Sequence, residues 1–257
     1  MVAVSAGASA TADAIAEQIF VFLWGDERAP LPTAVDHAYR RIWCQVITGA
    51  HEAGERLSDV ELAGRLGVSR TPVRQALHRL AQDELVRFDP RRGFWVREFT
   101  AKDVHEMYDV RAALEALALR QAAPHLRPED VQAQLGHIEA MRARLAERPV
   151  VPCLQHDFEL HNLLIHASGN GRLVRMLAGL RSQVSIFQIR DAAYPHRLEM
   201  ALDAHERVLV ALLAGRTEEA ARLLVEHIDE SKAAVLADMF DPRDMTPSRD
   251  AARGNRA

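Results

Sequence analysis

The stretch GERLSDVELAGRLGVSRTPVRQALHRLAQDELV, residues 54–86, decides how the first part of this 257-residue chain folds. Within it, the apolar spacing of DVELAGRL at 59–66 predicts a short helix, which a glycine turn at 67–68 ends. A second helix follows, with Ser69 as its N-cap and Pro72 in its first turn, where a backbone N–H has no intrahelical partner. Helix, turn and helix in this order predict a helix-turn-helix.

Two short runs rich in Val and Phe come next, LVRF at 85–88 and FWVREF at 94–99. The segment DPRRG at 89–93 between them is typical of a hairpin turn and places two arginines at its tip. A helix-turn-helix followed by a basic β-hairpin predicts a winged helix, which we expect to occupy residues 35–99.

The rest of the chain has the periodicity of helices, so the predicted fold class is mainly α. We expect helices near 101–124, 128–147, 153–167, 171–190, 197–214 and 218–239. Short loops between them predict an antiparallel bundle over residues 100–240. Residues 1–34 are expected to be a partly disordered extension with a short amphipathic helix at 11–24, and 241–257 a disordered tail.

The formal net charge of −4 is a sum of opposing parts. Residues 56–97 hold nine arginines against five acidic residues, a net +4, whereas residues 101–240 hold 16 basic against 20 acidic residues, a net −4. The mild acidity of the whole chain therefore does not exclude a DNA-binding domain.

Cysteine content and hydropathy point to a cytoplasmic protein. The two cysteines, Cys44 and Cys153, are too few for a disulfide framework, which favours a reducing compartment. No uninterrupted apolar run approaches 18 residues, so we expect no membrane span.

The predicted second helix begins with groups that suit DNA. Arg70, Thr71 and Arg74 lie in its first turns, and the two arginines are one turn apart on one face. An arginine that binds guanine in a bidentate manner is the commonest specific contact in the major groove, and the hydroxyls of Ser69 and Thr71 suit phosphate. The alternative is an ordinary solvated arginine face.

A second group of polar residues lies in PCLQHDFELHNLLIHASGN at 152–170. Asp157 and His161 are four positions apart and share one helix face, whereas His205 and His227 belong to later helices. Spacing alone does not show that the four converge, and the alternative is a pair of core histidines with ordinary hydrogen bonds. If they converge, one carboxylate and three imidazoles would hold a divalent transition metal, zinc first, or nickel or manganese.

The run at 54–86 resembles the winged-helix domain of the GntR family of bacterial transcription factors, whose hallmark is GVSRTPVR after a leucine-rich helix. The resemblance implies a set of DNA-contacting residues, which are Arg65, Ser69, Arg70, Thr71, Arg74, Arg91, Arg92 and Gly93. Among them, Arg65 would contact a phosphate and the hairpin at Gly93 would enter the minor groove.

Two departures from the family pattern occur in this region. The family usually has Pro-Gly where this chain has Ala53 and Gly54. It usually has Glu-Gly-Leu where this chain has Asp83, Glu84 and Leu85, so a glycine near the helix end is lost and the wing geometry is in question.

Residues 101–240 resemble the FCD effector domain of the FadR-type GntR regulators. The resemblance implies that Asp157, His161, His205 and His227 occupy its metal-ligand positions. Arg111 matches a position that pairs with an effector carboxylate, although an ion pair with Glu115 on the helix surface explains the same residue equally well.

These features together predict a one-component regulator and not an enzyme. A small organic acid would bind beside the metal and change how a homodimer reads a palindromic double-stranded operator. The family resemblance implies that this homodimer is a repressor. The alternative is a metal-dependent hydrolase or lyase with an accessory nucleic-acid domain, but its candidate bases, His156 and Glu159, should point away from the face of Asp157. A third interpretation, in which the chain is a helical scaffold that binds no ligand, does not explain the arginines of 70–74.

Overall fold

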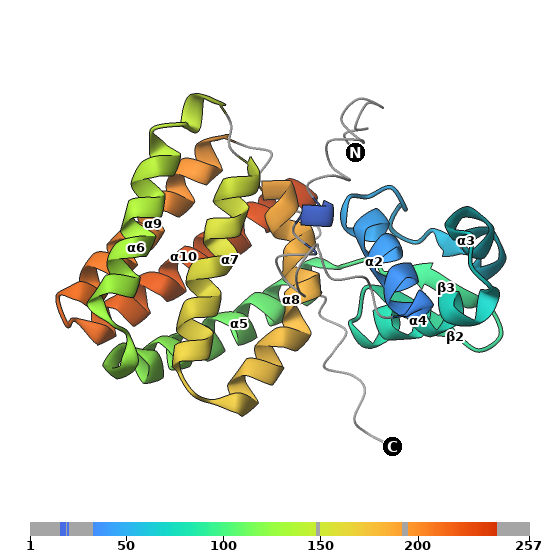
Figure 1. The fold of residues 1–257 in the computed structure, drawn as a ribbon, viewed down its shortest axis with the longest axis horizontal. Helices are drawn as coiled ribbons and strands as arrows, with labels where there is room; N and C mark the ends of the chain where they lie inside the picture. The colour runs from blue at the N-terminus through green and yellow to red at the C-terminus, as the bar shows by residue number, and fades with distance from the viewer. Residues whose placement is uncertain (1–15, 19, 21–32, 148–149, 192–194, 241–257) are drawn as a thin grey trace, which may run out of the picture.

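The structure is a computed structural model that describes residues 16–18, 20, 33–147, 150–191 and 195–240. The chain forms a small winged-helix part and a larger helical part, which meet along one long helix, α8 (Figure 1). The elements of the first part are α2 (Ala34–Ile47), β1 (Arg56–Leu57), α3 (Asp59–Leu66), α4 (Arg70–Gln82), β2 (Val86–Asp89) and β3 (Gly93–Val96). Those of the second are α5 (Ala101–Ala122), α6 (Pro128–Arg142), α7 (Val150–Ala167), α8 (Gly171–Asp191), α9 (Pro195–Leu213) and α10 (Thr217–Met239).

The helix-turn-helix has the predicted bounds and the predicted turn. The hydroxyl of Ser58 caps α3 by accepting the backbone N–H of Glu61, and Gly67 ends this helix in the left-handed conformation with φ of 67°. Helix α4 begins directly after Ser69, whose hydroxyl makes no capping hydrogen bond. The hydroxyl at the start of the second helix therefore remains available to other groups.

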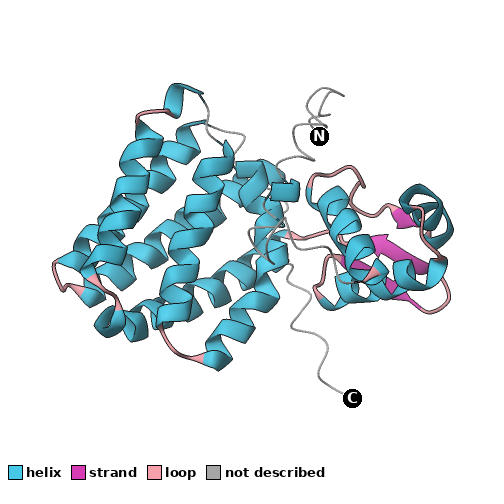
Figure 2. Cartoon of the chain, viewed as in Figure 1, coloured by secondary structure: helices cyan, strands magenta, loops and turns pink. Residues whose placement is uncertain are grey.

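The wing is a three-stranded antiparallel sheet of order β1-β3-β2 (Figure 2). The hairpin of β2 and β3 was expected, and its register pairs Asp89 with Gly93. Strand β1, in which Arg56 pairs with Trp95, was not predicted, because two residues are too few to show the alternation that is typical of a strand. The backbone N–H groups of Arg91 and Arg92 donate to the carboxylate of Asp89 and hold the turn.

The six predicted helices of the bundle are present and differ from the predicted bounds by a few residues. Thr100 and Asp103 form the capping box that begins α5. The helix predicted over 128–147 is too long, because α6 ends at Arg142 and the next residues form a short 3₁₀ turn. None of the described helices combines the length and the apolar character that a membrane span requires.

Part of the N-terminal extension packs against α2. Phe20 is 7% exposed and its ring meets Trp43 edge-on, while Glu17 pairs with Arg40 and Arg41. The remainder of the amphipathic helix expected at 11–24 and the disorder expected at the two termini lie outside the described residues.

The winged-helix and helical parts are joined by direct side-chain contacts on α8. The indole N–H of Trp43 on α2 donates to the Ser182 hydroxyl at 3.3 Å, and both residues are buried. On the same helix, the ring of Phe187 lies 5.4 Å from that of Phe99, the residue before the capping box of α5. Helix α8 therefore contacts both α2 and the segment that enters the bundle.

Glu84 occupies the position where the GntR pattern has glycine, and its φ of 57° is left-handed. Its carboxylate pairs with Arg97, and Arg97 also bonds the Glu84 carbonyl oxygen at 3.4 Å. A side chain in this conformation costs about 1 kcal/mol or more relative to glycine. The chain thus keeps the turn between α4 and β2 without the residue that suits it best.

We expect Glu84→Gly to raise the free energy of unfolding by about 0.5–1 kcal/mol, because it relieves the left-handed strain and loses only a surface ion pair. Denaturant unfolding measures the change. The control, Glu84→Ala, keeps the strain and loses the ion pair, so it should not be stabilised. Equal stability of the two variants would contradict this explanation.

Candidate functional site

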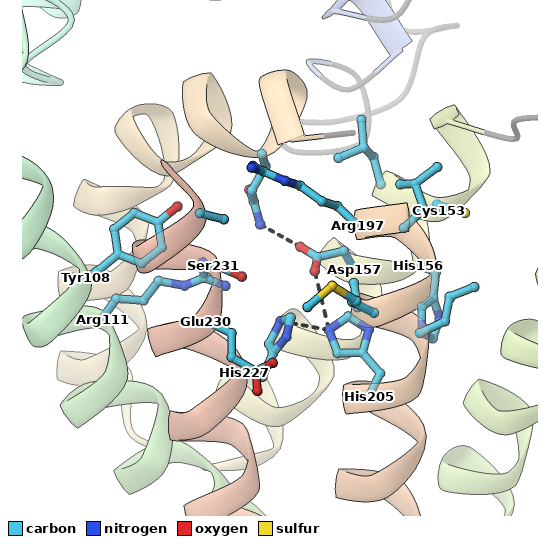
Figure 3. Close-up of a pocket in the computed structure, with 17 residues that line it drawn as sticks. Tyr108, Arg111, Cys153, His156, Asp157, Arg197, His205, His227, Glu230 and Ser231 are labelled. Atoms are coloured by element: carbon cyan, nitrogen blue, oxygen red, sulfur yellow. Dashed lines mark hydrogen bonds and ion pairs between the residues drawn. The ribbon is translucent and has the colours of Figure 1, made fainter. Parts of the chain in front are cut away.

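Four side chains from three helices converge inside the bundle, and Figure 3 shows three of them, Asp157, His205 and His227. Asp157 and His161 come from successive turns of α7, His205 from α9 and His227 from α10. One potential ligand atom of each lies within 4.8 Å of those of the other three. The structure therefore brings together the four residues that the sequence could not place relative to one another.

The spacing of these atoms suits a metal ion. Nε2 of His205 lies 3.1 Å from Nε2 of His227 and 3.4 Å from Oδ1 of Asp157, which is 3.8 Å from Nε2 of His161. Zinc binds histidine nitrogen at about 2.0–2.1 Å, which places neighbouring ligand atoms of a tetrahedral site roughly 3.3 Å apart. Three nitrogens and one carboxylate oxygen are also the donor set that zinc, nickel and manganese accept.

Burial sets the protonation of this cluster. It lowers the pKa of His227 to about 3 and that of His205 well below its usual value. The charges of His161 and Arg111 lower both pKa values further, whereas the charge of Glu115 partly opposes the shift at His227. Both rings are therefore neutral near pH 7 and keep a lone pair for a metal. Burial also raises the pKa of Asp157, an effect that the charges of His161 and Arg111 partly oppose.

Each of the two candidate ligands on α7 is held by a further side chain. The amide of Gln188 on α8 donates to Oδ2 of Asp157 at 2.5 Å. The carboxylate of Glu115 on α5 accepts a short hydrogen bond from Nδ1 of His161. A carboxylate behind a ligating histidine fixes the tautomer of the ring and leaves Nε2 for the metal.

Arg111 and Glu115 form the expected pair, but inside the protein. Nε of Arg111 lies 2.7 Å from Oε1 of Glu115, and the two residues are 5% and 4% exposed, so the helix-surface interpretation is wrong. Burial alone would raise the pKa of Glu115, but the charges of Arg111 and His161 outweigh it and lower this pKa to about 2.

A cavity of about 830 Å³, counting the part open to solvent, lies against the cluster. Tyr108 and Arg111 reach it from α5 (Figure 3). Its wall also combines apolar and polar side chains, among them Leu154, Leu198, Ala201, Leu202, Ala234, Cys153, Gln188, Arg197, Glu230 and Ser231. Burial, together with the charge of Asp157, raises the pKa of the Cys153 thiol to about 11, so this residue is a neutral part of the wall.

His156 and Glu159, the candidate bases of the hydrolase alternative, lie in different surroundings. Glu159 is 3.5 Å from His137 at the surface, on the side of α6. His156 is 2% exposed, lines the cavity and has its ring 5.3 Å from that of His205. Burial first, and then the neighbouring histidines, lower its pKa to about 4.

Glu115 and Gln188 are functional candidates that the sequence reasoning missed. For Glu115, the sequence does contain one sign of burial, because this residue lies on the apolar face of α5 that also holds Ala112, Ala116 and Leu119. For Gln188 the sequence contains no such sign, because a polar residue near the end of a long helix is usually solvated. Only the packing of α8 against α7 places it beside Asp157.

The predicted DNA-contacting residues lie on the winged-helix part. The side chains of Arg70 and Arg74 are 59% and 52% exposed at the start of α4, and both approach the carboxylate of Asp59, at 3.0 and 3.7 Å. Exposed ion pairs of this kind are weak, so a phosphate or a base can replace Asp59. Thr71 is exposed beside them.

The other predicted contacts lie on α3 and on the wing. Arg65 is exposed at the end of α3, with its guanidinium 3.3 Å from Nε2 of His51. Arg91 and Arg92 are exposed at the tip of the wing, and Gly93 has a φ of 100°, which only glycine adopts readily.

Comparison with known proteins extends over most of the chain. Residues 34–96 match the family model described as bacterial regulatory proteins, gntR family, and residues 106–230 match that of the FCD domain. The probable D-xylose utilization operon transcriptional repressor of Paenarthrobacter nicotinovorans is 32% identical over 72% of this chain and 80% of its own length. The Nta operon transcriptional regulator of Aminobacter aminovorans is 30% identical over 71% of this chain and 85% of its own length.

Solved structures agree on the fold. McbR/YncC of Escherichia coli superimposes with a TM-score of 0.66 at 24% identity, over 80% of this chain and 98% of that chain. A winged helix followed in the same chain by an all-helical part is therefore an established arrangement. The matches point to a transcriptional regulator without enzymatic activity and not to the hydrolase or lyase. This chain belongs to the GntR family of DNA-binding transcriptional regulators and carries an FCD domain.

Proposed function

We propose that this regulator is a cytoplasmic, ligand-responsive repressor whose bundle binds a divalent transition metal and a small carboxylate. We assign the DNA-reading role to residues 35–99 and the effector-binding role to residues 100–240. The observation that carries the proposal is the convergence of Asp157, His161, His205 and His227 beside a cavity.

The charges around the cavity explain why a metal and a carboxylate would bind together. Asp157 and Glu115 bring two carboxylates to this region, and the charge of Arg111 is already paired with Glu115. A carboxylate ligand would therefore meet little free positive charge from the side chains of the cluster. A bound divalent ion supplies that charge as a Lewis acid, and the guanidinium of Arg111 on the cavity wall can add a second contact.

We expect carboxylate binding to depend on the metal. In a thermal-shift screen of small mono-, di- and tricarboxylates, the metal-loaded chain should gain stability with at least one acid, because a ligand that binds only the folded state raises the melting temperature. Treatment with a chelator, or His205→Ala, should abolish both the shift and the metal found by elemental analysis.

The matched control for this experiment is His125→Ala, which removes an exposed histidine that belongs to neither the cluster nor the cavity wall. It should keep both the metal and the shift. Equal metal content in the wild type and in His205→Ala would exclude the cluster as the metal site.

DNA recognition is assigned to the start of α4 and to the wing. A helix that presents Arg70 and Arg74 at its N-terminal end can read guanines in the major groove, while Arg91 and Arg92 lie where a wing meets the backbone or minor groove. One winged helix contacts few bases. We therefore propose that a homodimer binds two half-sites of a palindromic operator.

We expect Arg70→Ala or Arg74→Ala to weaken operator binding by about 1–3 kcal/mol, roughly 5- to 150-fold, since each loses a bidentate base contact. Fluorescence anisotropy with the promoter of the chain's own or a neighbouring gene, at several salt concentrations, measures this. Arg144→Ala, which removes an exposed arginine of the bundle, is the control. Wild-type affinity in both α4 variants would refute the assignment.

Helix α8 supplies a physical connection between the two functions. Its Gln188 bonds the metal-ligand candidate Asp157, and its Ser182 accepts the indole N–H of Trp43 on α2. Ser182 also interacts with the hydroxyl of Tyr39, which donates at 2.5 Å to Asp83, the residue that ends the recognition helix α4.

We infer that metal and acid binding change operator affinity through this chain of contacts. A shift of Asp157 on binding would be passed by Gln188 to α8, and by Ser182 to α2 and the end of α4. Such coupling is a population shift, in which the ligand binds one arrangement of α8 and α2 better than the other.

We expect Ser182→Ala to reduce the ratio of operator dissociation constants measured with and without metal plus the active acid. One hydrogen bond contributes about 0.5–1.5 kcal/mol, so the ratio should fall about two- to tenfold. The control is Ser185→Ala, a buried serine of the same helix whose hydroxyl, among the described residues, bonds only the Arg181 carbonyl of its own helix. Equal ratios in the two variants would rule out Ser182 as a coupling residue.

A further inference from the structure

Two buried imidazoles, His156 on α7 and His205 on α9, lie side by side along the cavity wall. They are 2% and 1% exposed, and their ring centroids are 5.3 Å apart. Neither nitrogen of His156 has a hydrogen-bond partner within the described part of the chain, and the same holds for Nδ1 of His205. Buried polar atoms of native proteins are rarely left in this state, because their lost hydration is not replaced.

The orientation of His205 shows which of its nitrogens needs a partner. Its Nε2 faces the cluster, 3.1 Å from His227 and 3.4 Å from Asp157. If Nε2 binds the metal, the proton of the neutral ring is on Nδ1, which lies on the opposite edge of the ring. Ligating histidines almost always donate this second N–H to an acceptor that orients the ring.

The neighbouring ligand already has such a partner. Nδ1 of His161 contacts the carboxylate of Glu115, and this arrangement leaves its Nε2 for the metal. Within the described residues, His156 is the polar side chain with unpartnered nitrogens beside His205. A neutral imidazole offers both a donor and an acceptor, and a single oxygen atom can link two rings at this separation.

We propose that His156 is a positioning residue for the metal ligand His205 and acts through one bridging water. The Nδ1–H of His205 donates to the water, and the water donates to a nitrogen of His156. The bridge orients the His205 ring and makes its Nε2 a better ligand. This inference rests on the metal site of the proposed function and adds a residue to it that does not touch the metal.

The test compares His156→Leu with His156→Gln in the full-length, metal-stripped chain by competition for Zn²⁺ with a chromophoric chelator. Loss of a hydrogen-bond partner behind a ligand typically lowers metal affinity about 10- to 100-fold, so we expect His156→Leu to bind zinc that much more weakly. The amide of His156→Gln can still bond a water and should restore most of the affinity. His125→Leu, at an exposed site, should bind zinc like the wild type.

A second measurement separates a positioning role from a folding defect. In the bridged arrangement one nitrogen of His156 accepts from the water, and the other still has no partner within the described residues. Leucine removes this unpartnered buried atom, so the metal-free His156→Leu chain should unfold at no lower temperature than the metal-free wild type. Zinc affinity should fall while the stability of the metal-free chain does not. In the Co²⁺-loaded protein, the visible absorption bands should shift in His156→Leu and not in His156→Gln.

Each result decides between the two proposals. If the wild type binds no zinc, the metal site fails and the role of His156 fails with it. If the wild type binds zinc and His156→Leu binds it equally well, only the role of His156 is overturned. If His156→Leu is less stable without metal than the wild type, the histidine is structural and the inference is also overturned.

Discussion

Burial of ionisable groups inside the helical bundle is the constraint on which the rest of this structure depends. An uncompensated carboxylate in an apolar interior costs several kcal/mol. Glu115 avoids this cost because Arg111 lies against it, and the same carboxylate then holds His161 in one orientation. Asp157 instead lies 3.4 Å from His205, which burial keeps neutral as it does His227, so the cluster brings imidazole nitrogens and a carboxylate to a single point. A divalent cation is the ligand that balances this arrangement best, which is why the proposed function begins with a metal.

The position of the cluster is as important as its composition. It lies against α8, a helix of 21 residues that is about 31 Å long and therefore stiff enough to carry a displacement along its axis. One side chain of this helix bonds a proposed metal ligand, and another, less than two turns away, bonds the first helix of the DNA-reading part. The proposed effector site and the winged helix therefore share one element, so a change at one of them need not pass through the connecting segment alone. The ring of Phe187, between those two side chains, contacts Phe99 of that segment as well.

Predictions from the sequence succeeded where the signal was local. The bounds of α3 and the start of α4 follow from caps, a glycine turn and apolar periodicity, all of which act within a few residues. Predictions from the sequence were less accurate where an element depends on a partner that is distant along the chain. Strand β1 exists only because β3 lies beside it, and a pattern of two residues does not predict this pairing. The lost glycine at Glu84 raised doubt about the wing, yet the turn persists because the hairpin and Arg97 hold Glu84 in a left-handed conformation.

The sequence by itself determined the kind of protein this is. The helix-turn-helix with its basic hairpin, the six later helices and four residues of the right chemistry for a metal are all local or additive properties of the chain. Only the tertiary structure decided that those four residues meet, that Arg111 and Glu115 are buried, and that Gln188 and His156 belong to the site. The physical reason is that side chains on different helices are brought together by how the helices pack. A helix repeats every 3.6 residues and so defines its own faces, but it does not specify which neighbour each face will meet.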